Sequence, residues 1–220
     1  MTVAPHYRYK PSTYVQTYCS DEVADLAKIY EPDINVCIVE RPVDATLDDF
    51  VEHLLRQTSP ISFVENVTFA SFDFYRLLPD KGHLPGYRAF CQDVARLVGL
   101  YCDLFDLTRV GLRLRTLNHA MCPKFHVDSV TCRLICTYGS TGTEWLEEAY
   151  IDRSKLGLGS NGVCDEESGL ILDTDAIHRV PAYAIALFKG SHWEGNEQHG
   201  AVHRSPNVTE PRLLLTLDFG

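Results

Sequence analysis

The chain has 220 residues, of which 45% are hydrophobic and 23% are charged. This composition excludes a disordered or low-complexity chain and is enough for one substantial domain with a well-buried core. The 20 basic and 30 acidic side chains give a formal net charge of −10, which argues against a protein that holds a nucleic-acid backbone.

The chain shows no targeting or membrane-spanning signal. Residues 1–6 contain no basic segment followed by an apolar run, and no stretch approaches the roughly 20 apolar residues that span a bilayer. We therefore expect a soluble, cytoplasmic protein with no membrane partner. The eight cysteines form no Cys-x-x-Cys pair, and we expect most of them to be reduced thiols in the core.

Residues 1–108 predict a mixed, partly helical support that belongs to the same domain as the rest of the chain. Residues 34–39 are a short apolar run typical of a strand, and residues 61–74 contain a strand-like stretch rich in aromatic side chains. Residues 44–56 predict a helix with a capping aspartate at its start. Residues 85–107 predict the strongest helix, because their apolar positions follow the helical period.

From residue 109 onward the pattern changes to strands. Four are predicted, at residues 110–117, 131–138, 184–188 and 212–219. In the last of these, leucines alternate with other side chains, so that Arg212 and Thr216 share one face. Short strands between turns rich in glycine and proline, preceded by helices, predict an α+β fold in which N-terminal helices pack against a sandwich or barrel.

A candidate metal motif lies between two of these strands. In an extended segment His126 and Asp128 point to the same side, and imidazole nitrogen with carboxylate oxygen suits a first-row divalent metal. A third ligand from His203 would complete a set that leaves adjacent positions open on non-haem Fe(II). Arg212 carries the group best shaped to hold a carboxylate by two hydrogen bonds, and Thr216 offers a hydroxyl on the same face.

The order of His126-x-Asp128, His203 and Arg212 resembles the Fe(II)/2-oxoglutarate-dependent oxygenases over roughly residues 109–219. The resemblance implies a double-stranded β-helix (jelly-roll) core over residues 109–220. It also implies iron on the two histidines and Asp128, with 2-oxoglutarate on Arg212 and Thr216. The activity that it implies is oxidation or hydroxylation of a small-molecule or protein substrate, with release of CO2 and succinate. The chain departs from the superfamily pattern at Leu214, where a serine or threonine usually follows the arginine.

A closer resemblance covers nearly the whole chain. The segments 122–128, 132–134, 137–138 and 142–146 are similar to one uncharacterised bacterial family, whose members often lie beside genes for zinc-responsive metallochaperones. This resemblance implies a role in zinc homeostasis under metal limitation.

Other interpretations of the same residues stay open. The protein could be a noncatalytic zinc- or iron-binding protein of metal homeostasis on the same fold, or a metal-free interaction module. A separate zinc site could use soft ligands from a second group: His119, Cys122, Cys132 and Cys136. Arg115 and Arg133 flank the metal motif and could hold an organic acid in place of Arg212.

Overall fold

The computed structural model describes residues 16–57 and 59–220 as a mixed α/β fold built around two β-sheets. The expectation about a targeting signal concerns residues 1–6, and these lie outside the described residues. In the described part of the chain, no helix is both long and apolar enough to cross a membrane.

The larger of two sheets has seven strands in the order β1-β2-β8-β5-β10-β4-β3. Their bounds in that order are β1 (Gln16–Ser20), β2 (Ile34–Val39), β8 (Ile185–Lys189), β5 (Cys132–Tyr138), β10 (Arg212–Phe219), β4 (Arg109–Leu117) and β3 (Ser62–Thr68). Strands β1 and β2 are parallel, and the other neighbours are antiparallel. The first 108 residues therefore supply strands to both edges of this sheet.

A smaller antiparallel sheet has three strands, β7 (Ile177–Arg179), β6 (Glu144–Leu146) and β9 (Val202–Arg204). The helices are α1 (Ala45–Leu55), α2 (Tyr87–Phe105) and the short α3 (Asp165–Ser168). The 3-10 helices are η1 (Val23–Tyr30), η2 (Phe74–Arg76), η3 (Pro79–Lys81), η4 (Glu148–Tyr150), η5 (Arg153–Lys155), η6 (Gly157–Ser160) and η7 (Thr174–Ala176).

Both predicted N-terminal helices are confirmed, with bounds set by local backbone chemistry. The Asp44 carboxylate accepts a hydrogen bond from the Thr46 amide at 2.7 Å and so caps α1. Helix α2 begins only after Gly86, which has a left-handed backbone with φ of 74°. It ends where Asp106 takes a left-handed conformation, as is common at helix C-termini.

The strand-like stretch expected within residues 61–74 is confirmed as β3 (Ser62–Thr68). Strand β3 ends at Thr68, because the amides of Ser71 and Phe72 bond back to the Thr68 carbonyl at 3.1 and 2.9 Å and so form a turn. The aromatic side chains that follow pack on one another, with the rings of Phe72 and Phe74 4.9 Å apart. An aromatic run that suggests a strand thus serves mainly to close one end of the core.

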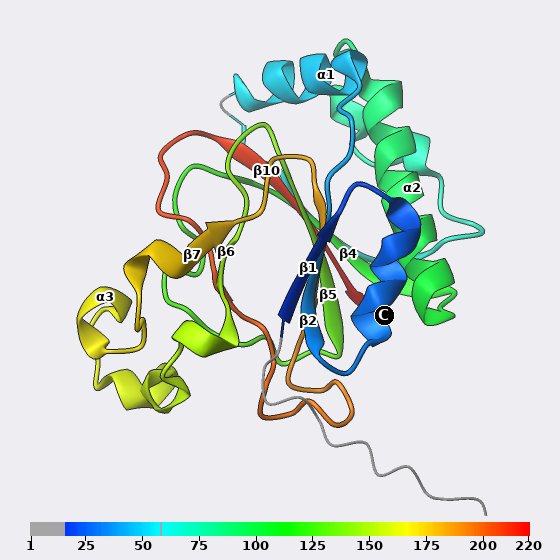
Figure 1. Cartoon of the computed structure of the whole chain (residues 1–220). Coiled ribbons are helices and arrows are strands. Elements are labelled where there is room, and N and C mark those ends of the chain that lie inside the picture. Colours follow the sequence, from blue (N-terminus) through cyan, green and yellow to red (C-terminus); the bar gives the residue numbers. More distant parts are fainter. Residues whose placement is uncertain (1–15, 58) are drawn as a thin grey trace, which may run out of the picture.

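The large sheet is covered on both faces, with α1 and α2 on one side and the small sheet on the other (Figure 1). On β10, Leu213, Leu215 and Leu217 are fully buried in the cluster that includes both helices. Arg212 and Thr216 lie on the opposite face and are buried as well, at 1% and 9% exposure. The polar face of the last strand is therefore an interior surface, and this surface carries the candidate site.

Candidate metal centre

The structure brings His126, Asp128 and His203 together, although His126 and His203 are 77 positions apart in the sequence. Strand β9 holds His203, and His126 faces it across an antiparallel bridge with two backbone hydrogen bonds of 3.0 Å. One ligand atom from each of the three side chains lies within 4.8 Å of the others. Within residues 16–57 and 59–220, this is the only such group of three histidine, cysteine or acidic side chains.

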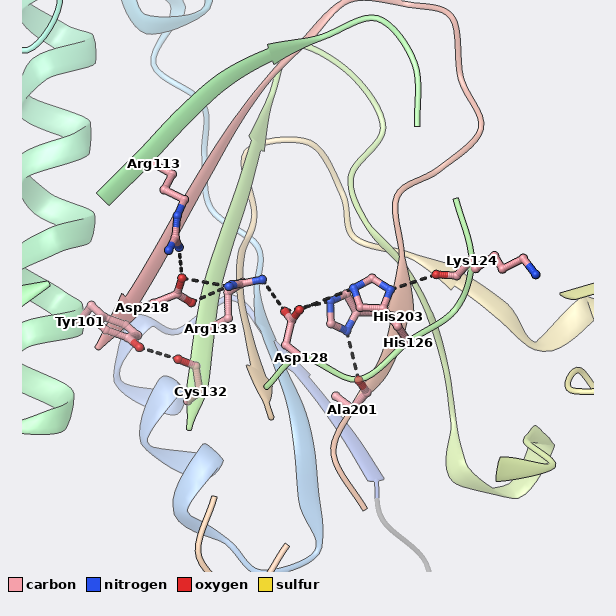
Figure 2. A network of polar contacts seen from close by, with 10 residues as sticks. All are labelled: Tyr101, Arg113, Lys124, His126, Asp128, Cys132, Arg133, Ala201, His203 and Asp218. Carbon is pink, nitrogen blue, oxygen red and sulfur yellow. Dashed lines mark hydrogen bonds and ion pairs between the residues drawn. The ribbon is translucent and has the colours of Figure 1, made fainter. Parts of the chain in front are cut away.

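Backbone carbonyls fix which nitrogen each histidine presents. Nδ1 of His126 lies 2.9 Å from the Lys124 carbonyl, and Nδ1 of His203 lies 3.1 Å from the Ala201 carbonyl. A carbonyl can only accept, so each Nδ1 carries a proton, and each Nε2 faces Asp128 and can bind a metal once it has lost its own proton. Both Nε2 atoms point to Asp128, at 3.5 Å for His126 and 3.2 Å for His203 (Figure 2). A hydrogen bond from the other ring nitrogen, here Nδ1, to a backbone carbonyl is characteristic of histidines that bind metals.

The charges around Asp128 keep its carboxylate ionised. Burial alone would raise the pKa of Asp128, but hydrogen bonds with His126 and His203 and the charge of Arg133 outweigh it and hold that pKa well below its usual range. The hydrogen bond to Asp128 raises the pKa of His126, against the opposing effect of burial. The three groups thus offer two imidazoles and one carboxylate, a donor set that suits Fe(II), Zn(II) or a similar divalent ion.

Arg212 lies in the same cavity and pairs with no acidic side chain among residues 16–57 and 59–220. The cavity has a volume of about 80 Å³ and is lined by the three candidate ligands together with Arg212 and Thr216. Nη2 of Arg212 donates to the His119 carbonyl at 3.1 Å and to the Ser205 hydroxyl at 2.9 Å. Nη1 is buried and finds no hydrogen-bond partner within the described residues. Burial lowers the pKa of this guanidinium, and a desolvated charge of this kind needs an anion.

Leu214 stands where the oxygenase pattern has a serine or threonine, and the structure shows which hydroxyl lies near Arg212 instead. Leu214 lines the cavity with an apolar side chain, and the hydroxyl beside Arg212 comes from Ser205 on the chain just after β9. Sequence reasoning missed Ser205, although it lies two residues after His203 in the segment that carries the resemblance. Thr137 and Thr143 also line the cavity and were missed, because nothing in their local sequence distinguishes them.

The alternative zinc site with soft ligands does not assemble in the described part of the chain. Cys132 and Cys136 are completely buried in the core on the helical side of the large sheet. Cys122 is exposed, and His119 meets the site only through its backbone carbonyl, which accepts from Arg212. The strand period explains the separation, since Cys132 and Cys136 lie on the opposite face from Arg133.

The two arginines considered as substitutes for Arg212 have different roles. Arg133 donates to Asp128 at 2.7 Å and to Asp218 at 2.7 and 2.9 Å, so acids of the protein already satisfy it. Arg115 is exposed, and its Nη1 lies 3.8 Å from the sulfur of Met121. Arg212 is therefore the one guanidinium of the three that is buried without a carboxylate.

Solved structures with a similar fold include two dioxygenases for auxin oxidation. The rice protein superposes with a TM-score of 0.52 at 12% identity, covering 93% of this chain and 82% of that chain. The Arabidopsis thaliana protein, solved in a binary complex with 2-oxoglutarate, gives 0.51 at 10% identity, covering 93% and 92%. At such identities the likeness shows a shared fold.

No curated protein matches the chain. The expected link to zinc metallochaperones finds no support in these comparisons. A family model does match residues 20–218, which is most of the chain, under the description "Protein of unknown function (DUF1826)". The chain belongs to this family.

Proposed function

We propose that the protein is an Fe(II)- and 2-oxoglutarate-dependent oxygenase that oxidises or hydroxylates an organic substrate. The observation that carries the proposal is the buried Arg212, whose Nη1 lacks a partner among the described residues, in one cavity with His126, Asp128 and His203. The shared fold with a dioxygenase whose structure contains 2-oxoglutarate supports it. Under this proposal the two facing sheets are a jelly roll, with its core supplied by residues 109–220.

The residues present fit the metal. His126, Asp128 and His203 would hold Fe(II) through two Nε2 atoms and one carboxylate oxygen, with the two Nδ1 protons kept on backbone carbonyls. This set occupies one side of an ion and leaves adjacent positions for other ligands. Arg133 would keep the carboxylate of Asp128 ionised and oriented.

The residues also fit the co-substrate. Arg212 would bind the distal carboxylate of 2-oxoglutarate through Nη1, while Ser205 and the His119 carbonyl hold Nη2 in place. Thr216 lies on the same face and would add a hydroxyl contact. Ile135 and Leu214 form apolar walls of the cavity and would exclude water around these charges, which strengthens the ion pair with Arg212.

When bound, iron and 2-oxoglutarate supply the oxidation of a C–H bond by dioxygen, with CO2 and succinate as products. The contribution of the chain is to position the two groups in one cavity and to leave an open side for the substrate. Arg133, Leu214 and Thr216 line both this cavity and a neighbouring one, and we infer that the substrate approaches from that side of the large sheet.

The test uses the full chain purified without oxygen, loaded with Fe(II) and 2-oxoglutarate, and then exposed to oxygen. We expect succinate to form, at least by uncoupled turnover, and to be lost in His126→Ala and in Arg212→Met. His178→Ala is the matched control, because His178 is a partly exposed histidine of the small sheet that lies outside the cavity. Absence of succinate from the wild type would contradict the proposal. Tight zinc binding without affinity for 2-oxoglutarate would favour a noncatalytic metal-binding protein.

A further inference from the structure

A second cavity adjoins the candidate metal centre and is lined by arginines. It has a volume of about 220 Å³, and its lining residues are Arg113, Arg115, Met121, Arg133, Leu214 and Thr216. Four of these, Met121, Arg133, Leu214 and Thr216, also line the cavity of the metal centre. The two cavities therefore share a wall, and a molecule in the second cavity would lie next to the candidate metal ligands.

The register of the strands explains why the arginines gather there. Arg113 of β4 pairs with Thr216 of β10, and Arg115 pairs with Leu214. Residues opposite each other on antiparallel strands share a face, so both arginines lie on the face of the large sheet that carries Arg212. Towards its β4–β3 edge this face is open, and Val64 in β3, paired with Arg113, is 52% exposed.

Acidic residues of the protein balance the charge of this wall only in part. Arg113 and Arg133 share the carboxylate of Asp218, and Arg133 also contacts Asp128. Arg115 makes no ion pair within the described residues, and its hydrogen-bond contact there is the thioether of Met121. No acidic residue lines the second cavity. A fork of guanidinium donors in this setting suits a carboxylate or a phosphate.

The apolar residues that line the second cavity indicate what the uncharged part of the ligand is. Met121 and Leu214 offer flexible and branched apolar surface between the arginines and the metal centre, which suits a short carbon chain. A volume of about 220 Å³ is close to the range of small-molecule sites.

We propose that the second cavity binds the primary substrate, and that this substrate is a small organic anion whose carboxylate or phosphate is held by Arg115 with help from Arg113. The proposal rests on the proposed oxygenase function, since it places the carbon chain of the anion towards the cavity that would hold iron and 2-oxoglutarate. Arg115 is a binding residue that sets substrate class, while Arg212 serves the co-substrate.

The test measures binding and not turnover. Titration calorimetry on the full chain uses hexanoate, hexyl phosphate and the neutral matched compound hexanamide. We expect at least one of the anions to bind and hexanamide to bind about tenfold more weakly or not at all. Arg115→Gln should weaken binding of the anion about tenfold, and Arg113→Gln should weaken it less. Arg109→Gln is the matched control, because Arg109 is an exposed arginine of the same strand outside the cavity.

The results separate the two arginine sites. Binding of the anion that is unchanged in Arg115→Gln but lost in Arg212→Met would assign the anion to the co-substrate site and overturn the proposal, as would equal binding of hexanoate and hexanamide. The comparison of hexanoate with hexyl phosphate identifies the head group. Binding that depends on Arg115 in a protein that forms no succinate would support the anion site and contradict the oxygenase function.

Discussion

Arg133 donates a hydrogen bond of 2.7 Å from Nη1 to Oδ2 of Asp128, the only carboxylate of the candidate metal centre. The remaining donors of the same guanidinium hold Asp218 on β10, so a single side chain connects two strands of the large sheet to the ligand segment (Figure 2). The carboxylate of the site is therefore oriented before any ion binds.

This contact predicts a role for Arg133 in metal affinity. Arg133→Met should lower the affinity for Fe(II) or Mn(II) by about 10- to 100-fold, because contacts that orient a ligand have effects of that size. Competition with a chelator at fixed pH measures the change. Arg113→Met is the matched control, since Arg113 pairs with Asp218 and not with Asp128. Equal losses in the two variants would assign the effect to Asp218 and general stability.

Arg212 should separate co-substrate binding from metal binding. Arg212→Met should weaken 2-oxoglutarate at least tenfold and leave metal affinity within about twofold, because the lost interaction is a charge-assisted pair that does not involve the ligands. The affinity of Arg212→Lys for 2-oxoglutarate should lie between those of the wild type and Arg212→Met, because lysine keeps the charge and loses the planar fork.

The stability of the same variant gives a second measurement. Without 2-oxoglutarate, Arg212→Met should lower the free energy of unfolding by no more than about 1 kcal/mol, since a desolvated guanidinium without an acidic partner is costly to bury. A much larger loss in urea unfolding would mean that Arg212 is a structural residue and not a binding residue.

Lys189 predicts a pH dependence of stability that is independent of the site. Its side chain is 1% exposed, with Nζ donating to the Glu31 carbonyl at 2.8 Å and lying 4.6 Å from the Trp193 ring centre. Burial lowers the pKa of Lys189 to about 8. The unfolded chain keeps the ordinary lysine pKa of about 10.4, so between these values the unfolded state binds more protons and stability rises with pH.

The measurement compares the wild type with Lys189→Met by urea unfolding at pH 7.5 and at pH 9.5. Between these two pH values the free energy of unfolding of the wild type should rise by roughly 2 kcal/mol relative to that of the variant, because each pH unit between the two pKa values is worth about 1.4 kcal/mol. Buried thiols such as Cys37 also titrate on unfolding, but they do so in both proteins and cancel in the difference. A difference that stays constant with pH would show that Lys189 is solvated in the folded protein.

Gly86 should be intolerant of a side chain. It has a φ of 74°, and a Cβ there would overlap the Thr46 carbonyl oxygen of α1 and lie 3.0 Å from Cβ of Phe50. Gly86→Ala should therefore cost about 3 kcal/mol or more of unfolding free energy, from the strained backbone together with the separation of α1 from α2. Gly169→Ala isolates the backbone contribution, because Gly169 has a φ of 81° and open space around it. That variant should lose only about 1 kcal/mol.

Local patterns were enough to predict much of the secondary structure. The alternation of leucines on β10 and the helical period of α2 reflect contacts within a single element, and both are confirmed by burial. Within residues 61–74 the pattern predicted a strand but not where it ends, because aromatic side chains favour a strand and also fill the end of a core. The strands of the small sheet have three residues each, too few to show a period.

The sequence by itself determined the types and order of the candidate ligands. It also determined that His126 and Asp128 point to the same side, because they are two residues apart in an extended segment. Only the tertiary structure decided which charges remain available. Arg133 lies five residues from Asp128, but its other acidic partner, Asp218, is 85 residues away. Strand pairing alone determines that Arg133 is neutralised, Arg212 is buried without an acid and Arg115 faces an open cavity. The physical reason is that a net charge counts groups, whereas the chemistry of a site depends on which of them are paired and removed from water.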